Sequence, residues 1–340
     1  MRRDHGIVNK AIDLIPDRIK AKAGAKAYEG FINLRRRVLN ARCLMAEISG
    51  GRKIEYLEID NGHEETLMFL HGFADSKDTF YDASQFLSQK FNLIIPDLPG
   101  FGRSFKRRHD RHNLDYFGKA MGEFVEKIEL YDFHLSGNSL GGAISVKTYL
   151  EVPDRIKSLS LVDPGGIYVK EPRNLHHELF DNHIIFDIKN RDDFEYFLNR
   201  VFSKHPLMPH PIKDHIFHEM MRHRLWHRKL LADLFSGMGS EDDPKLLDFA
   251  LNNCLKEIEC PTLILWGDDD TLFPKETAYV IKKEIPNSEI HFLLDVGHAP
   301  QIESPRRFAK VLTKFIESQN LKYFLAENQE TKKLVNSMES

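Results

Sequence analysis

The chain has 340 residues, of which 41% are hydrophobic and 29% are charged, and its formal net charge is −3 at pH 7. This composition is ordinary for a globular protein, and no run approaches the roughly 18 consecutive apolar residues that a membrane-spanning helix needs. The first twenty residues, MRRDHGIVNKAIDLIPDRIK, lack the apolar stretch and small-residue cleavage site of a secretory signal, so we expect a cytoplasmic location.

The N-terminal residues 1–48 are basic and amphipathic. They carry 11 Lys and Arg against 5 Asp and Glu, a local charge of +6. Apolar residues recur every three or four positions over 8–19 and again over 31–38, the pattern of a basic amphipathic helix. Two interpretations stay open: the apolar faces dock on the rest of the protein, or the segment attaches to an anionic membrane surface. Because the remaining chain is acidic and shows no binding motif, we expect no nucleic-acid partner.

Seven segments are expected to be β-strands. Several are near-continuous apolar runs, typical of central strands covered on both faces, and helical patterns lie between them. This alternation predicts an α/β fold with a mostly parallel sheet and helices on both faces. The expected strands are 54–60, 67–71, 92–97, 132–136, 157–163, 262–266 and 289–295.

Residues 166–250 interrupt the alternation. This interval is rich in helix formers and aromatic residues and contains the proline-punctuated segment KHPLMPHP. We therefore expect it to be a helical cap, or lid, over a core made of 49–165 and 251–320. In this division residues 1–48 are an N-terminal extension, and the polar residues 321–340 are a C-terminal tail.

The stretch HLSGNSLGGAIS, residues 134–145, predicts a nucleophile. Its Gly-x-Ser-x-Gly pattern places Gly137 and Gly141 two positions either side of Ser139, where a sharp strand-to-helix turn admits only small side chains. An alternating segment precedes the pattern and a helical segment follows it, as the motif requires. Ser139 is therefore a candidate catalytic nucleophile at the end of a strand.

A serine nucleophile needs a histidine base and a carboxylate that orients the base. WGDDDTLFP, residues 266–274, and LLDVGHAPQIESP, residues 293–305, each begin at an apolar strand, and ligands gather at the carboxyl ends of strands in such sheets. The second segment supplies His298 as the candidate base. The three consecutive aspartates of the first segment are candidate acids.

Six signatures occur in order along the chain: FLHGFADSKDTF, PDLPGFGRS, LSGNSLGG, SLVDPGGI, WGDDDTLFP and GHAPQIESP. Through them the chain resembles the α/β-hydrolases over residues 49–320, and more narrowly their monoacylglycerol lipase and esterase branch with a helical lid. The resemblance implies hydrolysis of a lipid-like acyl ester through an acyl-enzyme on Ser139. It implies no metal and no organic cofactor.

The resemblance also assigns roles by position. Ser139 would be the nucleophile and His298 the general base. Asp270 would be the acid, because the acid of this family usually sits four residues before a proline, here Pro274. The two aspartates before Asp270 would then be turn residues. Asp163, at the end of the expected strand 157–163, is a rival because some relatives keep their acid at that position.

Acyl transfer also needs hydrogen-bond donors aimed at the developing oxyanion. By resemblance these donors are the backbone N–H groups of Phe73 and Leu140, and His71 supports the oxyanion turn. Apolar residues of the expected lid either line an acyl pocket or only pack against one another. The residues that we single out for the pocket are Phe180, Phe186, Phe197 and Phe202.

Metal-binding patterns are weak in this sequence. His223 and His227 have the spacing of a zinc pair on a helix, but no third ligand is in view, and a polar helix face explains them as well. The three cysteines have no metal-like spacing, and we expect reduced thiols.

Two other functions remain as alternatives. Carbon–carbon bond hydrolases of aromatic ring-cleavage products share GNS-x-GG followed by PGG. They typically have a Gly-Pro-Gly element after the His-Gly pair and a Trp after the catalytic histidine, where this chain has Phe73-Ala74-Asp75 and Ala299. The other alternative is a non-catalytic ligand-binding protein, which would have no chemical need for a complete triad.

Overall fold

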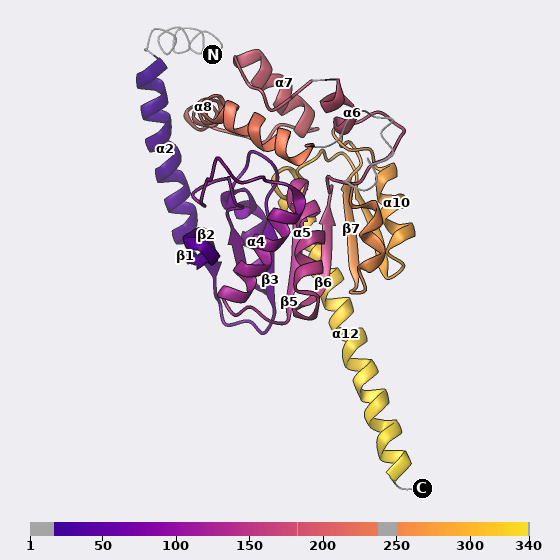
Figure 1. The fold of residues 1–340 in the computed structure, drawn as a ribbon. Coiled ribbons are helices and arrows are strands. Elements are labelled where there is room, and N and C mark those ends of the chain that lie inside the picture. The colour runs from indigo at the N-terminus through magenta and orange to yellow at the C-terminus, as the bar shows by residue number, and fades with distance from the viewer. Residues whose placement is uncertain (1–16, 182, 237–249, 339–340) are drawn as a thin grey trace, which may run out of the picture.

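The computed structural model describes residues 17–181, 183–236 and 250–338 (Figure 1). In that part of the chain, eight strands form one sheet in the spatial order β1-β2-β4-β3-β5-β6-β7-β8. β2 pairs antiparallel with both β1 and β4, and all the other neighbouring strands pair in parallel. The predicted α/β fold with a mostly parallel sheet is confirmed.

The seven predicted strands are present, close to their expected bounds. An eighth, β1, was not predicted, because it lies at the sheet edge and buries only its alternate residues Ala46 and Ile48. Residues 42–48 therefore belong to the sheet, not only to an N-terminal extension. The strands are β1 (Arg42–Ile48), β2 (Arg52–Ile59), β3 (Thr66–Leu70), β4 (Asn92–Pro96), β5 (Phe133–Asn138), β6 (Ile156–Val162), β7 (Thr262–Gly267) and β8 (Ser288–Leu293).

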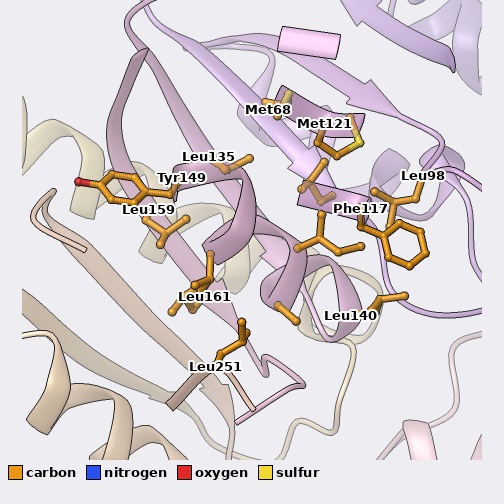
Figure 2. Packing of buried hydrophobic residues seen from close by; sticks show 14 of the residues in the cluster. Met68, Leu98, Phe117, Met121, Leu135, Leu140, Tyr149, Leu159, Leu161 and Leu251 are labelled. Carbon is orange, nitrogen blue, oxygen red and sulfur yellow. The ribbon is translucent and has the colours of Figure 1, made fainter. Parts of the chain in front are cut away.

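Helices cover both faces of the sheet. Successive residues of a strand point to opposite faces, and the central strands carry apolar side chains on both, so each face needs a covering layer. In β3, Met68 and Leu70 belong to one hydrophobic cluster, part of which Figure 2 shows, and Leu67 and Phe69 belong to the other. α4, α5 and α10 complete the first cluster, and α3 and the first part of α12 complete the second. The bounds are α3 (Tyr81–Leu87), α4 (Leu114–Lys127), α5 (Leu140–Glu151), α10 (Glu276–Glu284) and α12 (Pro305–Met338).

The helix α4 shows how local sequence and packing agree. The side chain of Asn113 caps the helix by accepting the backbone N–H of Tyr116 at 2.9 Å. Phe117, Met121 and Phe124 then recur at helical spacing, and all three are fully buried against the sheet.

Among the described residues between β6 and β7, three α-helices lie over the carboxyl ends of the strands (Figure 1). They are α6 (Leu175–Phe180), α7 (Arg191–Val201) and α8 (His210–Leu234). Phe194 and Leu198 of α7 pack with Phe217 and Met220 of α8 in a separate hydrophobic cluster. These helices occupy the interval that the sequence indicated as helical.

Two long helices flank this body. The helix α2 (Asp17–Val38) packs against α8, and its Arg35 and Arg36 form ion pairs with Asp82 and Asp78. The helix α12 begins against the sheet and extends away from the body toward its C-terminal end (Figure 1). None of the described helices has an apolar stretch long enough to cross a bilayer.

Candidate active site

Ser139 lies in the turn between β5 and α5, with φ 58° and ψ −120°. This backbone conformation is rare for a residue with a side chain and persists only where the surroundings impose it. Here the Ser139 N–H donates to the carbonyl of Val162 at 3.0 Å, and the Ser139 carbonyl accepts the N–H of Gly165 at 3.0 Å. Both bonds attach the turn to the end of β6.

The glycines of the motif are required by space. A Cβ atom at Gly137 would lie 2.1 Å from the carbonyl oxygen of Gly141, and one at Gly141 would lie 2.1 Å from the carbonyl oxygen of Leu70. Backbone atoms cannot yield at such distances. The strand-to-helix turn that the sequence predicted therefore requires glycine at both positions.

His298 and Asp270 meet at the carboxyl ends of β8 and β7. His298 Nδ1 lies 2.8 Å from Asp270 Oδ2, and the other oxygen of Asp270 accepts the N–H groups of Leu272 at 2.7 Å and Phe273 at 3.2 Å. A carboxylate at Nδ1 favours the tautomer that carries its proton there, which leaves the Nε2 lone pair able to accept a proton.

The other candidate acids occupy different positions. Asp269 accepts a hydrogen bond from Ser203 Oγ at 2.7 Å, and the backbone N–H of Asp268 donates to Leu293 at 3.1 Å. Asp163 is fully buried beside the pair, and ligand atoms of Asp163, Asp270 and His298 all lie within 4.8 Å of one another. Burial and the Asp270 charge raise the pKa of Asp163 well above its usual range. Among these aspartates, Asp270 is the one whose carboxylate is described in a hydrogen bond with His298.

His71 is fully buried and committed to the backbone. Its Nε2 accepts the N–H of Leu98 at 3.0 Å, and its Nδ1 lies 2.8 Å from the carbonyl of Gly72. Burial lowers the pKa of His71 to about 4. With both ring nitrogens engaged, His71 supports the turn after β3 and is not available as a second base.

The predicted oxyanion donors border the serine. Leu140 is the first residue of α5, so its N–H has no acceptor within the helix. Phe73 follows Gly72 at the end of β3, where a Cβ on that glycine would lie 3.4 Å from the Ser139 Cβ. Phe73 and Leu140 both line the cavity described next.

Two cavities meet at Ser139, Phe73 and Phe186. The first is lined mainly by apolar residues, including side chains of α5, α6 and α8, and His176 is one of its few polar residues. The second contains His298 in its wall and extends between α7 and α8 to α2. Its lining is mainly apolar near the serine and becomes polar under α2.

The cavity lining differs in part from the sequence prediction. Phe186 lines both cavities, Phe197 and Phe202 line the second, and the side chain of Phe180 lies outside the described part of the chain. Sequence reasoning missed the wall that α8 gives to the first cavity. The signal was its apolar spacing of three and four residues, at Leu231, Leu234 and Phe235.

The histidine pair of α8 reflects packing. His223 Nδ1 lies 3.0 Å from the carbonyl of Glu219 in the same helix, and the His227 ring contacts Phe73 and Phe101. Burial lowers the pKa of His227 to about 4. In the described residues, the side chains that could group around a metal ion are Asp163, Asp270 and His298, not this pair.

The end of α7 is hydrogen-bonded to the loop that carries His298 and to the loop that carries Asp270. The backbone N–H of His298 donates to the carbonyl of Val201 at 2.8 Å. The Arg200 guanidinium donates to the carbonyl of Thr271 at 2.7 Å, next to Asp270. The helix α7 is therefore joined by direct hydrogen bonds to the backbone of His298 and to the turn that carries Asp270.

A strained serine turn at the carboxyl edge of a mostly parallel sheet, with an acid and a histidine later in the chain, defines a hydrolase of the α/β class. The sequence model of the alpha/beta hydrolase fold family matches residues 65–305, and this chain belongs to that family. The resemblance inferred from the six signatures is confirmed.

Individual relatives are similar over most of their length. Lipase 3 of Moraxella sp. (strain TA144) is 32% identical over 259 residues, which are 76% of this chain and 79% of that protein. Monoacylglycerol lipase ABHD6 of Bos taurus is 27% identical over 266 residues, 76% of this chain and 77% of that protein. A solved structure of a membrane phospholipase A, described as a bacterial virulence factor, has a TM-score of 0.79 at 24% identity and covers 87% of this chain and 92% of its own; it supports the fold alone.

Proposed function

We propose that this protein is a serine carboxylic-ester hydrolase that acts on lipid-like esters such as monoacylglycerols. The observation that carries the proposal is the position of Ser139, where two largely apolar cavities meet and His298 stands in the wall of the second. A mainly apolar pocket with a few polar groups suits a substrate with a long hydrocarbon part. The names of the similar proteins, which include lipases and a monoacylglycerol lipase, support a lipid ester as the substrate.

The proposed reaction has two stages, acylation of the serine and hydrolysis of the acyl-enzyme. Ser139 Oγ attacks the ester carbonyl carbon while His298 Nε2 takes the hydroxyl proton, and Asp270 stabilises the imidazolium that forms. The N–H groups of Phe73 and Leu140 stabilise the oxyanion. Collapse of the intermediate breaks the bond to the alcohol, which leaves with the proton from His298. Water then hydrolyses the acyl-enzyme by the same steps and restores the free serine.

The helical interval 166–250 acts in this proposal as a lid. The helices α6, α7 and α8 supply much of the cavity lining and lie over the carboxyl ends of the strands (Figure 1). Residues 49–165 and 251–320 form the core that carries the nucleophile, base and acid. β1 adds the sheet edge to that core.

The test is hydrolysis of p-nitrophenyl esters and monoacylglycerols of increasing chain length by the unsubstituted protein and by Ser139→Ala. We expect hydrolysis that rises with chain length and falls by roughly 10⁴-fold or more in the variant, as for other serine nucleophiles. A fluorophosphonate should label the unsubstituted protein and not the variant.

Two results would redirect the proposal. Turnover of a ring-fission dienoate with no ester hydrolysis would favour the carbon–carbon bond hydrolase. Ligand binding that survives Ser139→Ala, with no turnover by the unsubstituted protein, would favour a binding protein.

A further inference from the structure

Asp163 has no part in the steps above, yet the fold presents its carboxyl group inside the site. Asp163 follows β6 with φ 43°, an unfavourable conformation for a residue other than glycine, and its side chain is fully buried. Its backbone N–H donates to Leu265 at 3.0 Å, and its Oδ1 accepts the N–H of Gly267 at 2.9 Å. These bonds hold the carboxyl group in a single place.

The second oxygen, Oδ2, is buried and accepts no hydrogen bond. An ionised carboxylate with an unpartnered buried oxygen is costly, and the cost grows when another carboxylate lies close by. Asp270 lies close by, because ligand atoms of Asp163, Asp270 and His298 fall within 4.8 Å of one another. Two such carboxylates share one proton most readily.

The proton belongs on Asp163 and not on Asp270. Both oxygens of Asp270 already have hydrogen-bond partners, because Oδ1 accepts two backbone N–H groups and Oδ2 is hydrogen-bonded to His298. Asp163 accepts a single backbone N–H. A protonated Oδ2 of Asp163 can donate a hydrogen bond, and the Asp270 carboxylate can accept it. The buried Oδ2 then has a partner.

The surrounding charges act in the same direction. Glu303 faces the pair from α11 (Pro300–Glu303), where its carboxylate accepts the N–H groups of Gly297, Ser203 and Lys204. Burial, Asp270 and Glu303 together raise the pKa of Asp163. A protonated Asp163 leaves one negative charge, not two, beside His298.

We propose that Asp163 is a positioning residue that, as a neutral carboxylic acid, donates a hydrogen bond from Oδ2 to the Asp270 carboxylate. The bond holds Asp270 against Nδ1 of His298 and leaves the negative charge on Asp270. The effect on rate rests on the proposed ester hydrolysis, but the protonation of Asp163 is testable without turnover.

The kinetic test compares Asp163→Asn with Asp163→Ala on a soluble p-nitrophenyl ester. Asparagine has the same shape, keeps an N–H donor for Asp270 and an acceptor for Gly267, and should recover most of the rate that alanine loses. We expect Asp163→Ala to lower kcat about tenfold with KM unchanged, as for the loss of one hydrogen bond to a charged group.

A matched control lies at the other end of the same strand. Ser158 is buried, and its Oγ lies 2.7 Å from His134 Nδ1. Ser158→Ala should lower the thermal midpoint and leave kcat unchanged. If Asp163→Ala behaves like this control, or if Asp163→Asn is as slow as Asp163→Ala, the positioning role is overturned.

The pH profile of kcat/KM tests the charge. Asp163→Asn removes no charge from a neutral acid, so the acidic limb should stay where it is in the unsubstituted protein. Removal of an ionised Asp163 would instead withdraw a negative charge from beside His298 and move that limb down by about one pH unit or more. The second outcome overturns the proposal.

An infrared difference spectrum between the Ser139→Ala protein and the same protein with Asp163→Asn needs no turnover. At pH 7 it should show the loss of a protonated carboxyl band.

The outcomes separate this inference from the proposed function. If the band is present but the unsubstituted protein hydrolyses no ester, the proposed function is contradicted and the protonation of Asp163 stands. Hydrolysis without the band would overturn this inference alone. Activity lost on chelation and restored by a divalent cation would assign the three side chains to a metal and overturn it too.

Discussion

At the scale of single residues, the conformation of Ser139 is imposed by its neighbours. Its positive φ is held by hydrogen bonds to Val162, the last residue of β6, and to Gly165, which follows β6. The close approach of Gly141 to the backbone of Leu70 brings α5 against the end of β3. The serine therefore reaches the cavities already oriented, and substrate binding has little backbone ordering to accomplish.

A pair of glycine variants tests this geometry. Gly141→Ala should destabilise the protein by several kcal/mol, about 4 or more, because its Cβ would overlap a backbone carbonyl. Gly30→Ala, in α2 with no atom within 4 Å of the added Cβ, should instead stabilise by about 0.5–1 kcal/mol. Urea unfolding measures both values. A native midpoint for Gly141→Ala would contradict the requirement for glycine at this turn.

The sequence predicted part of the site and left the rest open for a physical reason. Ser139 and His298 stand in local patterns with a direct chemical meaning, so a reader of the sequence can propose them. The acid could not be chosen from the residues alone, because Asp163 and Asp270 both follow strands and the hydrogen bond between Asp270 and His298 becomes visible only in the fold. The protonation of Asp163 depends on neighbours about a hundred positions away in the chain, which no local pattern encodes.

At the scale of elements, buried strands were predictable and the edge strand was not. β7 is buried along its whole length, and its residues TLILWG appear in the sequence as an apolar run. β5 is equally buried but alternates apolar and polar residues, and that alternation predicted it. β1 is largely exposed, and its residues lie within 1–48, the segment that was interpreted as a basic amphipathic extension. Its place in the sheet depends on pairing with β2, which becomes visible only in the fold.

The helix α2 combines docking with an exposed apolar face. Ile32 is buried and Arg35 and Arg36 are paired with the core, whereas Leu34 and Val38 are 62% and 65% exposed. The interpretation that this segment docks on the protein therefore holds for α2, through a different face from the one that the 31–38 pattern indicated. Residues 8–15 of the first amphipathic stretch lie outside the described part of the chain.

Contact of α2 with an anionic membrane surface stays a prediction. If the exposed pair contacts lipid, Leu34→Glu with Val38→Glu should abolish co-sedimentation with phosphatidylserine vesicles, because apolar contact is lost and charge repulsion is added. Hydrolysis of a soluble ester should not change, since neither residue lines a described cavity. A protein that does not sediment with these vesicles before substitution would refute the prediction.

At the scale of the whole molecule, the cavities are assembled from segments that are distant in the chain. The second cavity takes wall residues from α2, from the turn after β3, from α7 and from the loop of His298. Sequence periodicity identifies an apolar helix face but not the opposing surface. The lining was therefore predicted only in part, and the contribution of α2 was not predicted at all.

Three buried histidines make the folded state sensitive to acid. Burial lowers the pKa values of His71, His176 and His227 to about 4. The unfolded chain binds protons below the ordinary value of about 6.5 while the folded protein does not, so stability is complete above that pH and is lost as pH falls toward 4. The free energy of unfolding in urea should decline across this window.

A variant of His227 provides the check. His227→Phe keeps an aromatic ring beside Phe73 and Phe101 and removes one titrating group. We expect a smaller loss of unfolding free energy between pH 6.5 and pH 4 than in the unsubstituted protein. Parallel curves for the two proteins would show that His227 does not contribute.

The attachment of α7 to the site limits how substrate can enter. Val201 holds the backbone of His298, and Arg200 holds the turn of Asp270, so a swing of this helix away from the core would pull the acid–base pair apart. A gate hinged at the end of α7 would switch off the enzyme each time it opened. The start of α6 is attached to the same turn, because the Leu175 N–H donates to the carbonyl of Leu272 at 2.9 Å. In the proposed function, a movement that admits substrate and keeps Asp270 beside His298 would therefore occur at the α8 border of the helical interval.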